Sequence, residues 1–564
     1  MNEKVYVATE QTQKEIKDAV SSINDKIGSG SVGGGISPHI TVAAPTGCTV
    51  TVKNGETVLT PTEHEGVWEQ NVPYFGTWEV STEIESRLIS KTVEVSALTL
   101  YRVRLSKFEA AIKVLAPEGA TITCVGNGES QSITSTGEDS IPVYAAGKYT
   151  VTRNKNGKIA EREIEVTENG ATVPLVLSYR WGYKKMKSEG QPSARVVYLF
   201  DAEGMTPAKV DLSTGAFDPG DWGDAFFVKK NRPVMLKYDR TVDYELNHSD
   251  QTKKLDGSPS DISDTSYQGN AMSEIPLGWV NRYEDSEWEY EIVCEHQWDK
   301  DYKAYAHTRA DGSIADAFYW SMFGGSGSAS QIRSLADQTA AASLTAPNEI
   351  AGAQANGDGW YIHTWSQREY IRTLLILMGK STHTQAVYGN GNCRSGSQGS
   401  VLRTGTLKDK GQFWGSSDST KQVKVFYIER MWGDQWDRTA GIIDNKGPIY
   451  YKMTPEGAGY QTDNVTGYTN SGVTLTGTVS QGYINATKCG EFGCIPTAAT
   501  GSETQFECDG AWWNQTQLNY LIAGASADNA PGVGGAFAFS VDTLASRSHW
   551  TYGCGLSAEK PVAA

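Results

Sequence analysis

The sequence has no long run of hydrophobic residues. The longest, Leu374 to Met378, is far shorter than the ~20 apolar residues that a membrane-spanning helix needs. The opening stretch, MNEKVYVATEQTQKEIKDAV, is polar where a secretory signal peptide requires a continuous apolar core. These absences predict no membrane insertion and no signal-directed export, so we expect the product to be made in a cytoplasm.

Positive charge is also in short supply. The chain carries 50 Lys and Arg against 66 Asp and Glu, a formal net charge of -16. A surface of that sign repels phosphate backbones and anionic lipids, which argues against nucleic-acid and membrane-surface binding. The charge balance suits a soluble, exposed component of a particle.

Cysteine and histidine are sparse, with 8 residues of each. The cysteines are too scattered for a disulfide scaffold, and their only local cluster is Cys489 and Cys494 with Cys508. Buried thiols are the favoured interpretation there and a zinc site the alternative, because no histidine lies nearby in sequence. The histidines form no common hydrolytic metal motif, and the Asp-rich loops do not fit the EF-hand pattern. We therefore expect no metal, no cofactor and no enzymatic activity.

Glycine and tryptophan, by contrast, are abundant, with 59 and 16 residues. Long amphipathic periodicity is scarce, so turn-rich β structure is predicted rather than a helical bundle. At 564 residues the chain is too long for one hydrophobic core, and three or four folded units are expected. The predicted fold class is mostly β with some helix, in several domains.

Residues 1–35 are predicted to attach the protein to a partner. Aliphatic residues recur along one helical seam at Ile16, Val20, Ile23 and Ile27. The Gly/Ser-rich stretch 28–35 follows as a flexible linker. A docking helix and an oligomerising or particle-anchoring segment are both compatible with a seam this short.

The next part of the chain repeats itself at an offset of 71 to 72 residues. Ala44–Thr51 matches Ala116–Thr123, and Gly76–Val80 matches Gly147–Val151. Each copy consists of short alternating runs separated by Asn-Gly or Gly turns. That pattern predicts two tandem Ig-like β-sandwiches.

The two predicted sandwiches cover residues 36–98 and 99–179. The second contains the sequence Pro-Glu-Gly-Ala at Pro117–Ala120 and resembles PEGA-type domains, which implies a spacer. Neither copy gathers a set of acids, bases or metal ligands, so a stalk is favoured over a binding module.

Residues 180–564 are expected to form one large α+β head around three stretches. His363–Tyr370 opens a helix, which Gly379 would end. Val423–Ile443 begins as an alternating strand and ends in a tryptophan corner, and Gly534–Ser557 supplies the closing strands. The helix cap is either Thr364 with Gln367 or Ser366 with Glu369.

These stretches resemble the formylglycine-generating-enzyme branch of the C-type lectin fold. His363–Tyr370 resembles its Thr-Glu-Ala-Glu-Trp-Glu-Tyr helix, and Gly433–Asp437 resembles its Gly-Asn-Val-Trp-Glu corner. The resemblance implies a lectin-like head and raises an oxidising enzyme as an alternative. That enzyme needs a cysteine where this chain has Leu556, and Cys554 lies two residues earlier. A buried structural thiol is the favoured interpretation of Cys554.

The segment Asp509–Tyr520 is the predicted contact surface. Adjacent Trp512 and Trp513 cannot both face a core from one strand, so at least one is expected to be exposed or in a loop. Aromatic faces beside amides suit sugar or protein recognition, and the alternative is that both indoles cap the core. The segment also resembles, by its position, the variable segment in targets of diversity-generating retroelements. The candidate receptor-binding residues are Trp512, Trp513, Asn514, Gln515, Gln517, Asn519 and Tyr520.

The region from Tyr179 to Ser557 resembles tail and fibre proteins of phages of gut bacteria. That resemblance implies a virion structural protein, a tail-fibre or host-recognition component whose head binds a bacterial surface receptor, either glycan or protein. The N-terminal segment would bind other virion proteins, a homotrimer is expected by analogy with fibres, and lysis would release the assembled particle. A bacterial surface adhesin and a formylglycine-generating-type enzyme are the alternatives.

Overall fold

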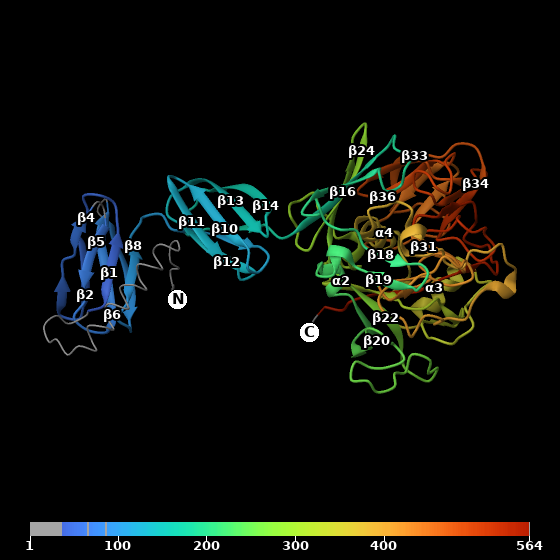
Figure 1. Ribbon diagram of the computed structural model, residues 1–564, viewed down its shortest axis with the longest axis horizontal. Helices are drawn as coiled ribbons and strands as arrows, with labels where there is room; N and C mark the ends of the chain where they lie inside the picture. Colours follow the sequence, from blue (N-terminus) through green and yellow to red (C-terminus); the bar gives the residue numbers. More distant parts are fainter. Residues whose placement is uncertain (1–36, 65–66, 85–86, 563–564) are drawn as a thin grey trace. The chain divides into compact units, whose positions relative to one another are not determined.

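The computed structural model describes residues 37–64, 67–84 and 87–562. The predicted N-terminal helix and linker, residues 1–35, lie outside the described residues. Contacts divide the chain between Ser178 and Tyr179 into two compact units (Figure 1). The protein is mostly β with few helices and has several domains, as the composition predicts. Within the described ranges, no helix is both long and apolar enough to cross a membrane.

The first unit holds two β-sandwiches built on one plan. In the first, the sheets β4-β5-β1-β8 and β3-β2-β6-β7 share one core, and in the second the sheets are β12-β9-β15 and β11-β10-β13-β14. The strands are β1 (His39–Ala43), β2 (Val50–Asn54), β3 (Thr57–Leu59), β4 (Thr62–His64), β5 (Val67–Asn71), β6 (Gly76–Ile84), β7 (Arg87–Val95), β8 (Leu100–Arg104), β9 (Ala110–Leu115), β10 (Thr121–Gly126), β11 (Glu129–Thr134), β12 (Glu138–Val143), β13 (Gly147–Lys155), β14 (Lys158–Val166) and β15 (Thr172–Val176).

The sequence repeat corresponds to equivalent strands. β6 starts at Gly76 and β13 at Gly147, an offset of 71 residues. β8 pairs in parallel with β1, and β15 pairs in parallel with β9. β8 therefore completes the first sandwich, and the predicted boundary between residues 98 and 99 is too early. Strand pairing sets this boundary, and the alternating pattern alone does not reveal it.

The Asn-Gly turns differ slightly between the copies. In the second copy Asn127 and Gly128, with φ of 50° and 78°, form the two-residue turn between paired Gly126 and Glu129. Positive φ at both turn residues matches the twist of the flanking strands, which is why Asn-Gly is favoured there. In the first copy Asn54 itself pairs with Thr57, so the turn is shifted by one residue.

The second unit, Tyr179–Ala564, contains three larger sheets: β17-β16-β24-β23, β21-β20-β22-β25-β41-β28, and β33-β32-β31-β38-β39-β37-β34, with β40 pairing to β31. Their strands are β16 (Arg180–Met186), β17 (Val196–Phe200), β20 (Arg232–Lys237), β21 (Val242–Glu245), β22 (Gly269–Pro276), β23 (Trp279–Glu284), β24 (Trp288–Cys294), β25 (Ala317–Ser321), β28 (Trp360–Ile362), β31 (Trp436–Asn445), β32 (Pro448–Tyr451), β33 (Thr469–Thr474), β34 (Val479–Tyr483), β37 (Gly510–Trp513), β38 (Leu518–Ala523), β39 (Phe539–Val541), β40 (Tyr552–Gly553) and β41 (Leu556–Glu559).

In the described part of the second unit, four two-stranded hairpins and seven short or medium helices connect these sheets. The hairpin strands are β18 (Lys209–Asp211), β19 (Ala216–Asp218), β26 (Ser326–Ser328), β27 (Gln331–Arg333), β29 (Lys424–Val425), β30 (Ile428–Glu429), β35 (Ala486–Gly490) and β36 (Gly493–Ala498). The helices are η1 (Gly220–Trp222), α2 (Phe226–Lys229), η2 (Tyr305–His307), α3 (Ala346–Gln354), α4 (Trp365–Gly379), α5 (Thr384–Tyr388) and η3 (Gln398–Ser400).

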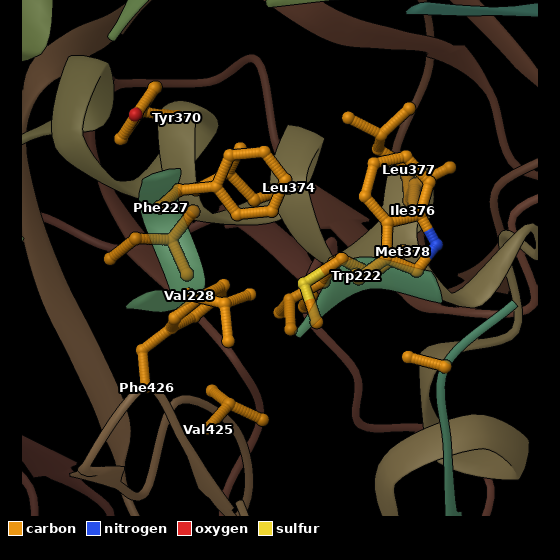
Figure 2. Close-up of a cluster of buried hydrophobic side chains, with 14 of the residues drawn as sticks. Trp222, Phe227, Val228, Tyr370, Leu374, Ile376, Leu377, Met378, Val425 and Phe426 are labelled. Carbon is orange, nitrogen blue, oxygen red and sulfur yellow. The ribbon is translucent and has the colours of Figure 1, made fainter. Parts of the chain in front are cut away.

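The helix predicted after His363 is α4, and it runs through the middle of the second unit. Thr364 is its N-cap and forms the capping box with Gln367, which decides between the two predicted caps. The helix ends at Gly379 as predicted, although Lys380 rather than the glycine adopts the left-handed conformation, with φ of 49°. Residues Trp365 to Met378 are all buried. Figure 2 shows the C-terminal half of α4 packed against α2 and the β29–β30 hairpin.

The strand predicted from Val423 is interrupted. β29 and β30 form a tight hairpin whose turn residues, Phe426 and Tyr427, have φ of 50° and 62°. Both side chains are nevertheless buried, at 1% and 3% exposure. Burial of these rings in two neighbouring cores stabilises a backbone conformation that bulky residues rarely adopt. The alternating residue pattern over Val423–Tyr427 therefore belongs to a hairpin and not to one continuous strand.

Candidate functional site

The predicted contact segment lies in the largest sheet. Trp512 and Trp513 are the last residues of β37, with exposures of 8% and 3%. Trp512 packs edge-on against Trp436 at a ring distance of 5.0 Å on one face, whereas Trp513 joins the core on the other face. The prediction that at least one indole is exposed or loop-borne is therefore wrong. It overlooked a central strand that is buried on both faces.

The remaining candidate residues surround the turn that follows β37. Asn519 and Tyr520 are buried in β38, where Asn519 Nδ2 donates to Asp444. Asn514, Gln515 and Gln517 are partly exposed. Asn514 Oδ1 accepts from Thr516 and so holds the turn. Only these three amides are placed to meet a partner, and their receptor-binding role stays a prediction.

A Ser-His-Asp arrangement links three stretches of the second unit. Ser321 Oγ donates to His363 Nε2 at 3.0 Å, and His363 Nδ1 donates to Asp437 Oδ2 at 2.6 Å. Burial lowers the pKa of His363 although Asp437 opposes this shift. The pKa of Asp437 is lowered because His363, Arg430 and Arg368 outweigh the burial that would raise it.

This arrangement has the hydrogen-bond order of a hydrolytic triad, but it is sealed. Ser321, His363 and Asp437 are exposed by no more than 4%, and the ring of Trp320 stacks on the imidazole at 3.5 Å. The backbone N–H of Leu556 also donates to Ser321 Oγ. A nucleophile must reach a substrate to act. As folded here, the three groups serve as a buried polar link between β25, the start of α4 and β31.

The cysteines expected to matter also occupy closed positions. Cys489 and Cys494 form a disulfide across the β35–β36 hairpin, so the interpretation as free buried thiols is wrong for this pair. Cys508 and Cys554 are free and buried. Burial raises the pKa of Cys554 well above its usual value, which leaves a thiol rather than the thiolate that oxidation chemistry needs. Cys554 is thus buried, as the sequence favoured.

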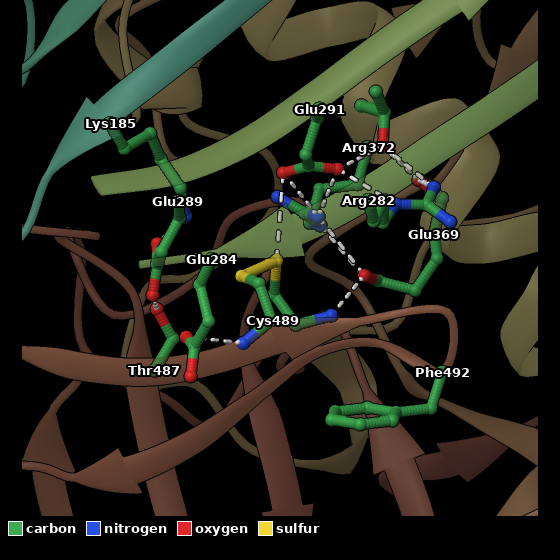
Figure 3. The surroundings of a disulfide bond; sticks show 12 residues. Lys185, Arg282, Glu284, Glu289, Glu291, Glu369, Arg372, Thr487, Cys489 and Phe492 are labelled. Atoms are coloured by element: carbon green, nitrogen blue, oxygen red, sulfur yellow. Dashed lines mark hydrogen bonds and ion pairs between the residues drawn. A yellow bond between two sulfur atoms is a disulfide. The ribbon is translucent and has the colours of Figure 1, made fainter. Parts of the chain in front are cut away.

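The disulfide lies beside a buried network of charges (Figure 3). Glu291 accepts from Arg372 at 2.8 Å and from Arg282 at 2.9 Å. Arg372 also donates to Glu369, whose other carboxylate oxygen accepts the backbone N–H of Cys494. Burial would raise the pKa of Glu291, but the cations around it lower that pKa. The network ties α4 to β24 and to the hairpin. Because these charges are paired with one another, the network has a structural role.

A cavity of about 240 Å³ opens beside the N-terminus of α4. Its walls come from η2 and the residues after it, from β25, β28 and β41, from the first turn of α4, and from the loop before Tyr460. The side chains include aromatic rings, hydroxyls and amides, among them Tyr305, Phe318, Tyr361, Thr364, Ser366, Gln367 and Tyr460. Concave sites of this mixed character are the usual places for small ligands.

Local sequence patterns do not predict this cavity. The sequence predicts Thr364, Ser366 and Gln367 only as candidate cap residues, and no local pattern singles out Tyr361 or Tyr460. In the described part of the chain, no group of three His, Cys, Asp or Glu side chains is suited to hold a metal ion.

The Ser-His-Asp arrangement and the free cysteines Cys508 and Cys554 are buried, whereas the cavity is open, so the cavity is the strongest candidate for ligand binding.

Comparisons with known proteins do not assign the chain to a family. No family model matches, and no curated protein matches. Among solved structures, the Bacillus anthracis TIE protein is 10% identical with a TM-score of 0.13, and the match covers 45% of this chain and 47% of that one. A candidate cell adhesion protein from Bacteroides fragilis is 9% identical with a TM-score of 0.12, over 23% of this chain and 78% of that one. The chain thus spans about half of the TIE protein, and similarity this low carries no functional argument.

Proposed function

We propose that this chain is a virion structural protein of a phage, a tail-fibre or host-recognition component whose C-terminal unit binds a bacterial surface receptor. The cavity beside α4 carries the proposal, because it is a concave site with aromatic, hydroxyl and amide walls. Two repeated sandwiches precede that unit, as suits a spacer before a binding head. The lectin-like resemblance of the head supports the same function.

The sealed Ser321–His363–Asp437 arrangement and the protonated Cys554 favour binding over catalysis. A hydrolase or a cysteine oxidase needs its reactive group at a surface that substrate can reach. Both reactive groups here lie under other side chains. The partly exposed amides Asn514, Gln515 and Gln517 are a second contact surface in the proposal.

The test is binding of the fluorescently labelled full-length protein to a panel of intact gut-bacterial strains. We expect saturable binding to one or more strains, and we expect antibody against residues 179–564 to label phage particles that contain the protein. Light scattering should give a homotrimer. If no strain binds the protein and particles are not labelled, the proposed function is wrong. Labelling of bacterial surfaces in phage-free cultures would instead indicate an adhesin.

A further inference from the structure

We propose that the cavity beside the N-terminus of α4 is a subsite for one neutral sugar ring. The proposal rests on the receptor-binding function above and names the ligand class. At about 240 Å³ the cavity is smaller than the ~300–1,000 Å³ of pockets for drug-sized molecules. A single six-membered ring with its substituents fits that scale better than a peptide segment does.

Aromatic rings provide the apolar part of the site. Tyr361 and Tyr460 lie with their ring centroids 5.7 Å apart at an interplanar angle of 36°, and both are half-buried. Tyr305 adds a third half-buried ring to the wall. A sugar has one face of C–H groups, and such a face stacks on an aromatic ring and leaves its hydroxyls free for hydrogen bonds.

His307 is a buried, neutral part of the wall. It is 2% exposed, and burial lowers its pKa to about 4, so the ring is neutral near pH 7. Nε2 donates to the carbonyl of Pro276 at 3.0 Å, which leaves the lone pair on Nδ1. Among the described residues Nδ1 has no hydrogen-bond partner. Nδ1 has almost no accessible surface, so His307 shapes the wall but is not itself a contact for the ligand.

The charges in the wall do not favour an acidic ligand. Arg309 is the only lysine or arginine among the lining residues, and its guanidinium already donates to the carbonyls of Lys560 and Pro561 and to Ser313. Glu559 is the only carboxylate there, and it accepts the backbone N–H of Ala310. One arginine and one carboxylate leave the wall without a net positive charge, so nothing in it favours a carboxylate or phosphate over a neutral ligand. Thr364 Oγ1 and Gln367 Oε1 are engaged in the capping box of α4, and the Ser366 hydroxyl and the Gln367 Nε2 amide beside them suit a neutral polyol.

The experiment uses full-length protein and methyl glycosides of glucose, galactose, mannose, N-acetylglucosamine and fucose, with galacturonic and N-acetylneuraminic acids as acidic probes. Binding is measured by ligand-observed NMR and by competition with cell binding. Tyr460→Ala should weaken neutral-sugar binding at least about tenfold. Tyr361→Ala, which removes the second ring of the pair, should weaken it roughly two- to tenfold.

Tyr283→Ala is the matched control, since Tyr283 is 43% exposed, stacks on Tyr290 and does not line the cavity. It should bind sugars as the wild type does, and circular dichroism should show all three variants folded. If acidic sugars bind and neutral ones do not, the ligand class is wrong. If the protein binds cells, no sugar binds, and Tyr460→Ala binds cells normally, the subsite is wrong while the proposed function stands. If neutral sugars bind but no cells do, the subsite holds and the proposed function fails.

Discussion

His363 donates from Nδ1 to Asp437 at 2.6 Å, and this hydrogen bond joins the start of α4 to β31 inside the second unit. Arg368 and Arg430 approach the same carboxylate at 3.5 and 3.7 Å. One buried carboxylate thus compensates two cations and fixes one imidazole. Its role is to hold the start of α4 against the start of β31.

Asp437→Asn should destabilise the protein by about 3–5 kcal/mol, because two buried guanidinium groups lose their carboxylate. Ser321→Ala removes one neutral hydrogen bond and should cost about 1–3 kcal/mol. Denaturant unfolding of both variants measures the difference. Equal, small effects would contradict the view that Asp437 compensates the arginines.

A fluorophosphonate probe tests whether the same arrangement is sealed. Folded protein should not react at Ser321, because Trp320 and the surrounding backbone cover the side chain. Mass spectrometry of the digested protein locates any adduct. Modification of Ser321 in the folded protein, abolished by His363→Ala, would instead reveal a working nucleophile.

Acid should weaken the fold through His307, whose pKa falls from 6.5 to about 4 on burial. The unfolded chain takes up the proton more readily than the folded one. The free energy of unfolding that depends on a neutral His307 is therefore fully present above pH 6.5 and is lost as the pH falls toward 4. The loss amounts to about 3 kcal/mol. Buried carboxyls such as Glu349, whose pKa burial raises to about 8, act in the opposite direction.

A comparison with His307→Phe separates these effects, because the carboxyls are common to both proteins. The unfolding free energy of the wild type minus that of the variant should fall by about 3 kcal/mol between pH 7 and pH 4. Chemical denaturation at several pH values gives this difference. A difference that does not change with pH would show that His307 titrates normally.

Trp512→Ala and Trp513→Ala should each destabilise the protein by about 3–5 kcal/mol, because each indole fills a core on its own side of β37. Gln517→Ala, in the partly exposed turn, should change stability by less than about 0.5 kcal/mol. Unfolding and cell binding are measured on all three. If an indole variant keeps its stability but loses cell binding, the indole is a receptor contact after all.

Loss of the Cys489–Cys494 bridge should lower the unfolding free energy by about 2 kcal/mol, since it closes a short loop. The double variant Cys489→Ala/Cys494→Ala and reduction of the wild type should give the same loss. Cys48→Ser, at a half-buried free cysteine of the first unit, is the control. The bond does not form if reductant leaves the unfolding free energy of the wild type unchanged and both thiols can be alkylated in the unfolded, unreduced protein.

Features that depend on neighbouring residues could be predicted from the chain's local patterns. The repeat at 71 residues, the Asn127-Gly128 turn and the Thr364 cap each arise from local backbone chemistry, so short patterns predict them. The mostly β class follows from composition for the same reason.

The burial of the two indoles, the Ser321–His363–Asp437 arrangement and the cavity beside α4 depend instead on packing between distant segments. Trp512 and Trp513 are both buried only because other elements cover each face of the sheet that contains β37. His363 is 42 residues from Ser321 and 74 from Asp437, and the cavity draws its walls from segments between Tyr305 and Glu559. Side chains that meet only after long loops close leave no periodic signal in the chain, and their partners are fixed by packing.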